Sequence, residues 1–153
     1  MKKGIIIGAG IGGLTTAIAL AQKGIQVQIY ERASEIKEVG AGVWIAPNGM
    51  QIFDKLGIAQ EVAAAGTKLK RISVVDLNYK PISVIDGAEI EAKHQFGTIA
   101  IHRASLQQIL ASKVHPEHLH LNKAFKHYEQ NGTAVTVYFE DGSTAVADFL
   151  ICA

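Results

Sequence analysis

The chain has 153 residues, of which 48% are hydrophobic and 19% charged, a length and composition that fit one globular domain and argue against a disordered chain. The net charge of +1 gives no electrostatic basis for binding nucleic acid or an anionic membrane. The single cysteine, Cys152, excludes an internal disulfide and fits a reducing, cytoplasmic location, and its apolar neighbours predict a small buried side chain.

The first part of the chain reads as a strand, a helix and a second strand. Apolar runs predict strands at about 3–8 and 26–31. Between them, apolar residues at helical spacing predict a helix at about 11–23, with Gly24 as its C-terminal cap. Two parallel strands joined by a helix form a right-handed βαβ unit, so we expect an α/β fold of Rossmann-like type.

A glycine-rich loop, Gly8-Ala9-Gly10-Ile11-Gly12-Gly13, lies between the first strand and the helix, and Glu31 ends the second strand. This combination is typical of dinucleotide-binding proteins. Gly8 allows a tight turn, Gly10 lets the backbone approach a pyrophosphate, and Gly13 lets the helix pack close to the strand. The N–H groups at the start of the helix attract phosphates, and Glu31 would accept hydrogen bonds from ribose hydroxyls.

The same stretch has an alternative interpretation, because no charged residue occurs between Gly4 and Gln22. An uncharged run near the amino terminus can indicate a signal peptide or a membrane-spanning segment. The many glycines are a poor composition for either, and neither explains Glu31 at the distance that a dinucleotide site requires. We therefore expect no membrane partner.

The middle of the chain alternates between helical and strand patterns. Two strands are expected around the turn at Asn78-Tyr79, and another strand leads directly into a helix. The elements predicted here are a helix from Pro47 to Gly57, a short helix over 59–65, strands near 72–76 and 82–86, a strand over 98–102 and a helix over 103–114.

The final third carries the clearest strand pattern. Strand-like runs at 125–128, 134–139 and 145–152 are separated by Asn131-Gly132 and Asp141-Gly142, both strong hairpin signals. We expect an antiparallel three-stranded β insertion within one α/β body.

Two groups of polar residues were candidates for other chemistry. His115, His118 and His120 could be metal ligands, but Pro116 and Glu117 favour an exposed turn. Asp76 and Asp86 could form a carboxylate pair, although solvated strand ends explain them as well. We expect no metal site.

Several motifs occur in one order along the chain. They are Gly-Ala-Gly-Ile-Gly-Gly-Leu at 8–14, Tyr-Glu-Arg at 30–32, Gly-Ala-Gly-Val at 40–43, Pro-Asn-Gly at 47–49, His-Arg-x-x-Leu-x-x-x-Leu at 102–110 and Phe-Glu-Asp-Gly at 139–142. In this order they resemble the amino-terminal part of the single-component FAD-dependent aromatic hydroxylases, a family that includes salicylate, hydroxybenzoate and urate hydroxylases. The resemblance covers essentially the whole chain.

The resemblance implies FAD-binding roles for particular residues. They are Gly8, Gly10, Ile11 and Gly13 at the pyrophosphate, Glu31 with Arg32 at the adenosine ribose, Val43 and Trp44 near the flavin, Arg103 at the phosphate and ribitol region, and Phe125 at the adenine. A guanidinium group such as that of Arg103 suits phosphate oxygens. Phe125 has an equally plain interpretation as strand core.

The resemblance also implies an activity. In such enzymes NAD(P)H reduces the FAD, and the reduced flavin reacts with molecular oxygen to give a C4a-hydroperoxide that hydroxylates an aromatic or other electron-rich small molecule. The cofactor supplies this chemistry and the protein binds, orients and excludes water, so no residue here is assigned a catalytic role. A noncatalytic dinucleotide-binding module and an NAD-dependent dehydrogenase domain remain as alternatives.

The resemblance further implies a larger two-domain fold. Residues 1–153 would be the amino-terminal part of the FAD-binding domain, with about 69–100 contributing to the substrate-side sheet. The family's Asp-Gly motif, expected directly after the last strand, and its later Gly-Asp motif are missing here. We therefore expect an incomplete fragment that is weakly active or inactive alone.

Overall fold

A computed structural model describes residues 2–36 and 41–153 of the chain. The chain divides into two compact units, of which unit 1 comprises Met1–Glu38 and Gln107–Ala153, and unit 2 comprises Val39–Leu106. Gly40, part of one family motif, lies outside the described residues. No helix in the described ranges is long and apolar enough to cross a membrane.

Unit 1 is built on a four-stranded parallel sheet with the order β12-β1-β2-β8. Its elements are β1 (Lys3–Ile7), α1 (Ile11–Gln22), β2 (Gln26–Tyr30), a 3-10 turn η1 (Pro116–His118), β8 (Leu119–His120) and β12 (Phe149–Cys152). The predicted βαβ unit is confirmed. β1 is an inner strand of this sheet, and its Ile5 and Ile6 are almost completely buried.

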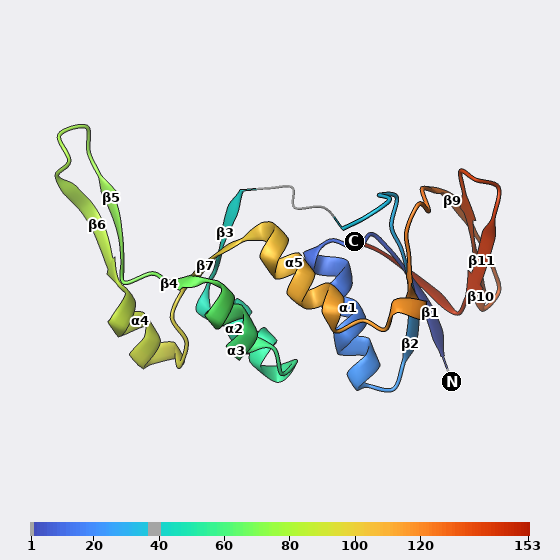
Figure 1. The fold of residues 1–153 in the computed structure, drawn as a ribbon, viewed down its shortest axis with the longest axis horizontal. Coiled ribbons are helices and arrows are strands. Elements are labelled where there is room, and N and C mark those ends of the chain that lie inside the picture. Colours follow the sequence, from blue (N-terminus) through green and yellow to red (C-terminus); the bar gives the residue numbers. More distant parts are fainter. Residues whose placement is uncertain (1, 37–40) are drawn as a thin grey trace. The chain divides into compact units, whose positions relative to one another are not determined.

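A second, antiparallel sheet covers one face of this parallel sheet. It has the order β11-β10-β9, formed by β9 (Phe125–Asn131), β10 (Ala134–Phe139) and β11 (Thr144–Ala147). Ile5 of β1 joins its core cluster, whose other buried members are Val135, Val137, Phe139 and Ala147. Figure 1 shows α1 on the opposite face of β1 and β2, so unit 1 has three layers.

The expectation of one strand over 145–152 is wrong. The chain leaves the antiparallel sheet after Ala147 and enters the parallel sheet at Phe149. Asp148 lies between the two strands and is bonded to Lys3 of β1. Its N–H donates to the Lys3 carbonyl at 2.9 Å, and its carboxylate accepts the Lys3 N–H at 2.6 Å, which directs the chain into the parallel sheet. Cys152, predicted to be buried, is exposed at the end of β12.

Unit 2 contains a small antiparallel sheet with the order β3-β7-β4 and two short helices. Its elements are β3 (Gly42–Ile45), α2 (Pro47–Lys55), α3 (Ala59–Ala65), β4 (Thr67–Lys68), β7 (Ile99–His102) and the start of α5 (Arg103–Ser112). Both helices and β7 were expected, whereas no strand was predicted at the position of β3. Met50, Phe53 and Val62 of the helices are buried, as are Ile99 and Ile101 of β7.

The rest of unit 2 is a hairpin followed by a helix. β5 (Arg71–Val75) pairs with β6 (Pro81–Asp86) in a two-stranded ribbon (Figure 1), as the sequence predicted. α4 (Gly87–His94) was not predicted. Asp86 is its N-cap, since its carboxylate accepts N–H groups of Ala88 and Glu89.

Candidate functional site

The glycine loop between β1 and α1 contains two kinds of glycine. Gly8 has a φ of +104°, and a Cβ there would lie 2.5 Å from the Ala153 carbonyl oxygen. A Cβ at Gly13 would collide with the Gly8 carbonyl oxygen. At Gly10 and Gly12, by contrast, it would meet no atom of the described chain within 4 Å. The fold itself therefore requires Gly8 and Gly13, while Gly10 and Gly12 border open space that a ligand can approach.

The start of α1 faces this open space without a cap. Gly10 is the N-cap, has extended backbone and provides no side chain, and the first turn holds no acidic residue. The first intrahelical bond runs from the Leu14 N–H to the Gly10 carbonyl at 3.0 Å, so the N–H groups of residues 11–13 have no acceptor within the helix. Together with the positive end of the helix dipole, they suit an anion such as a pyrophosphate.

Glu31 is tied to the glycine loop through its carboxylate. One oxygen accepts the Ala9 N–H at 2.8 Å and the other accepts the Ala33 N–H at 2.9 Å. These two bonds use about half of the acceptor positions of an ionised carboxylate, so Glu31 can still accept bonds from two hydroxyls. Arg32, the next residue, is exposed.

The segment before β9 is fixed against the end of β2. The Lys123 N–H donates to the Glu31 carbonyl at 2.8 Å, and the Asn122 N–H donates to the Ala33 carbonyl at 3.0 Å. Phe125 follows at the start of β9 and packs against the core cluster of unit 1. The structure therefore supports its interpretation as strand core, and its role at an adenine stays a prediction.

The three candidate histidine ligands have other partners. His118 lies in η1, where its Nδ1 is 2.9 Å from Gln28 Nε2, and His120 in β8 has its Nε2 2.6 Å from Gln28 Oε1. Burial lowers the pKa of His120, and the electrostatic effects of Lys123 and His118 lower it further. In the part of the chain that the structure describes, no three His, Cys, Asp or Glu residues are grouped to hold a metal ion.

Three of the expected site residues lie in unit 2. Val43 and Trp44 are neighbours on β3, so their side chains point to opposite faces of the strand, and Trp44 is 63% exposed. Arg103 begins α5, where its N–H donates to the Ala41 carbonyl at 3.2 Å. Its exposed guanidinium has no hydrogen bond or ion pair with the described residues, which leaves it available to a phosphate.

Comparison with known proteins identifies the family. The family model for the FAD binding domain matches residues 2–153. The chain belongs to this family.

The relatives of this FAD binding domain include enzymes with named substrates. The chain is 34% identical over 99% of its length to the FAD-dependent urate hydroxylase of Klebsiella pneumoniae, and 32% identical over 95% to the 3-amino-4-hydroxybenzoate 2-monooxygenase of Streptomyces cremeus. The crystal structure of Klebsiella pneumoniae HpxO complexed with FAD and uric acid matches 97% of the chain with a TM-score of 0.87 and 31% identity, and 38% of that chain is covered. The present chain spans about 40% of the length of the curated relatives it matches.

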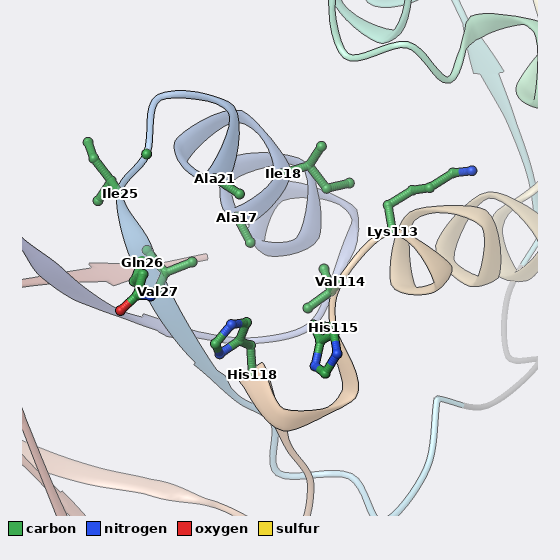
Figure 2. A pocket seen from close by; sticks show the side chains of 11 residues that line it. Ala17, Ile18, Ala21, Ile25, Gln26, Val27, Lys113, Val114, His115 and His118 are labelled. Atoms are coloured by element: carbon green, nitrogen blue, oxygen red, sulfur yellow. The ribbon is translucent and has the colours of Figure 1, made fainter.

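A cavity of about 430 Å³ lies at the other end of the parallel sheet of this FAD binding domain. Figure 2 shows it between α1, the start of β2, the end of α5 and η1, with Ala17, Val27, Val114 and His118 around it. Since the glycine loop follows the carboxyl end of β1 and this cavity borders the amino end of β2, the two are separate. The cavity is not the dinucleotide site.

One residue of the glycine-loop site was missed in the sequence. Gln107 of α5 donates a hydrogen bond from Nε2 to the Ala9 carbonyl oxygen at 2.7 Å, over 98 residues of sequence. A glutamine on a helix is ordinarily a solvated polar residue, so its type alone gave no signal. The one sequence signal for Gln107 is its position inside the family motif at 102–110, directly after Leu106.

Proposed function

We propose that this chain is the amino-terminal part of the FAD-binding domain of an NAD(P)H-dependent flavoprotein monooxygenase that hydroxylates an aromatic or other electron-rich small molecule. The observation that carries the proposal is the open face of the glycine loop. There, Gly10 and Gly12 border free space beside the uncapped start of α1, and Glu31 is tied to the same loop.

The residues that would hold FAD fall into two groups. In unit 1, the loop residues Gly8, Gly10, Ile11 and Gly13 would receive the pyrophosphate, Glu31 and Arg32 the ribose, and the backbone near Phe125 the adenine. In unit 2, Arg103 would meet a phosphate oxygen, while Val43 and Trp44 would lie near the flavin. The proposal is supported by the Arg103 guanidinium, which has no partner among residues 2–36 and 41–153, and by the unused acceptor positions of Glu31.

When bound, FAD would supply the redox and oxygen-transfer chemistry, with NAD(P)H and molecular oxygen as co-substrates. The residues of this chain would bind and orient the cofactor, and none is proposed to act as a catalytic acid or base. The single Cys152 fits the cytoplasmic location that we propose for the protein.

The substrate side is proposed to include residues of about 69–100. The hairpin of β5 and β6 carries exposed apolar side chains such as Val74 and Ile82, which are suited to packing against another apolar surface. The relatives named above act on urate and on an aminohydroxybenzoate, and we propose a substrate of this class, a small planar ring with electron-donating groups.

The test is a comparison of FAD, NAD and NADP as ligands of the purified chain, by calorimetry and by thermal shift. We expect FAD to bind most tightly, and Glu31→Ala to weaken it about 100-fold or more, because two charge-assisted hydrogen bonds to the ribose are lost, each of about 1.5 kcal/mol or more. A preference for NAD would indicate a dehydrogenase domain instead. Equal binding of FAD and ADP would favour a nucleotide-binding module.

We expect little or no oxidation of NAD(P)H by this chain alone.

A further inference from the structure

Gln107 of α5 hydrogen-bonds the glycine loop. Its half-buried amide donates to the Ala9 carbonyl oxygen at 2.7 Å. A carbonyl oxygen can only accept, so it must be the nitrogen of the Gln107 amide that faces it. The bond therefore has a fixed direction, and it ties the loop to a helix that lies far away in the sequence.

Ala9 is thereby held on both sides. Its N–H donates to the Glu31 carboxylate at 2.8 Å, while its carbonyl accepts from Gln107. The residue is fully buried, and the preceding Gly8 N–H is bonded to the Tyr30 carbonyl at 2.8 Å. Little freedom remains for the backbone from Gly8 to Ala9.

This arrangement sets the direction of the next peptide. In a trans peptide the carbonyl and the following N–H point in opposite directions, and the described chain contains no cis peptide. Since the Ala9 carbonyl points to Gln107, the Gly10 N–H points away from Gln107. The Gly10 N–H has no acceptor among the described residues, and a Cβ at Gly10 would meet open space, so this N–H is available to a ligand.

We propose that Gln107 is a positioning residue of the dinucleotide site, which fixes the peptide between Ala9 and Gly10 so that the Gly10 N–H faces the pyrophosphate. The inference rests on the proposed function for the identity of the ligand. The orientation of the peptide itself does not depend on that function, and it can be measured without a ligand.

The first test measures the unliganded chain by NMR. Gln107→Met keeps the length of the side chain and removes the donor. We expect the carbonyl ¹³C resonance of Ala9 and the amide resonances of Ala9 and Gly10 to shift, and the exchange of the Ala9 amide hydrogen to quicken. The control is Gln130→Met, the same change on the exposed face of β9, which should leave these resonances in place.

The second test measures ADP binding by calorimetry. We expect Gln107→Met to raise the Kd about 5-fold, as for the loss of one hydrogen bond, and Gln130→Met to leave it unchanged. Gln107→Glu gives a signature that a purely structural role would not produce, because a carboxyl group can donate to the Ala9 carbonyl only when protonated. Its Kd relative to wild type should be raised about 10-fold at pH 7.5 and should recover as the pH falls to about 4, near the ordinary pKa of a glutamate carboxyl.

The outcomes separate the two ideas. The positioning role would be overturned by unchanged Ala9 and Gly10 resonances or an unchanged Kd for ADP in Gln107→Met. It would equally be overturned by an equal effect of Gln130→Met, or by the absence of recovery in Gln107→Glu. If the wild-type chain binds neither ADP nor FAD, the proposed function fails. The NMR comparison then still decides whether Gln107 fixes the loop.

Discussion

The two units use apolar strands in different ways. In unit 1, β1 is covered by α1 on one face and by the antiparallel sheet on the other, and Ile6 is 0% exposed. In unit 2, the hairpin of β5 and β6 has an equally apolar sequence, yet Ile82 is 70% exposed. An apolar sequence pattern thus predicts a strand in both places, but it does not tell whether other residues of the same chain bury that strand.

The largest expected effect comes from filling the contact between helix and strand in unit 1. Gly13→Ala should destabilise unit 1 by about 3 kcal/mol, because its Cβ collides with the Gly8 carbonyl oxygen. Urea unfolding followed by far-UV circular dichroism measures the loss. Fluorescence of Trp44, the single tryptophan, reports on unit 2 in the same experiment.

The matched control for this prediction is Gly12→Ala. Its Cβ meets no described atom within 4 Å, so it should be neutral or stabilising by about 0.5 kcal/mol through helix propensity. If Gly12→Ala and Gly13→Ala had equal costs, the division of the loop into fold-required and ligand-facing glycines would be wrong.

A second prediction compares buried and exposed strands directly. Ile6→Thr should cost about 3 kcal/mol, because it buries a hydroxyl and removes packed methyl groups. Ile82→Thr should change stability by only about 0.5 kcal/mol or less, and should reduce self-association measured by light scattering. A large loss of stability in Ile82→Thr would contradict this comparison, because it would show that the Ile82 side chain is buried by other residues.

A third prediction separates the fold of the glycine loop from its ligand. Gly10→Ala should leave the urea midpoint nearly unchanged, since the added Cβ enters open space. The same Cβ should weaken FAD binding by about 10-fold, because it occupies the volume through which the backbone meets the pyrophosphate. Calorimetry with FAD checks this, and unimpaired binding would place the ligand elsewhere.

The smallest expected effect concerns His120. Its pKa is lowered below the ordinary value of 6.5, so near and below pH 6.5 the unfolded chain takes up a proton more readily than the folded one. Stability attributable to His120 is therefore present above pH 6.5 and is lost as the pH falls through the lowered pKa. His120→Phe should show a smaller loss of stability between pH 7.5 and 5.5 than the wild type. An NMR titration midpoint above 6.5 would contradict the sign.

Sequence reasoning succeeded where structure is local. The βαβ unit, both helices after Pro47, the hairpin at Asn78-Tyr79 and the turns at Gly132 and Gly142 each follow from periodicity or turn residues within a few positions. Asp86 followed by Glu89 was a readable cap signal for α4, but it was taken as a strand end.

The failures involve partners distant in sequence. The break at Asp148 depends on Lys3, and the strand at Gly42–Ile45 depends on its pairing with β7. Neither partner can be read from the neighbouring residues. Within the site, the glycines and Glu31 were predicted from spacing, whereas Gln107 is defined only by a contact across 98 residues.

The pairing of β1 with β12 has a consequence for biosynthesis. β1 lies between β12 and β2 in the sheet, and Lys3 of β1 is separated from its partner Asp148 by 145 residues. The edge of β1 that pairs with β12 therefore stays unpaired until these late residues have been synthesised. During that interval the apolar face of β1 also lacks the antiparallel sheet. The nascent chain thus exposes an unpaired strand edge beside the future cofactor loop, a site at which chaperones or aggregation would compete with folding.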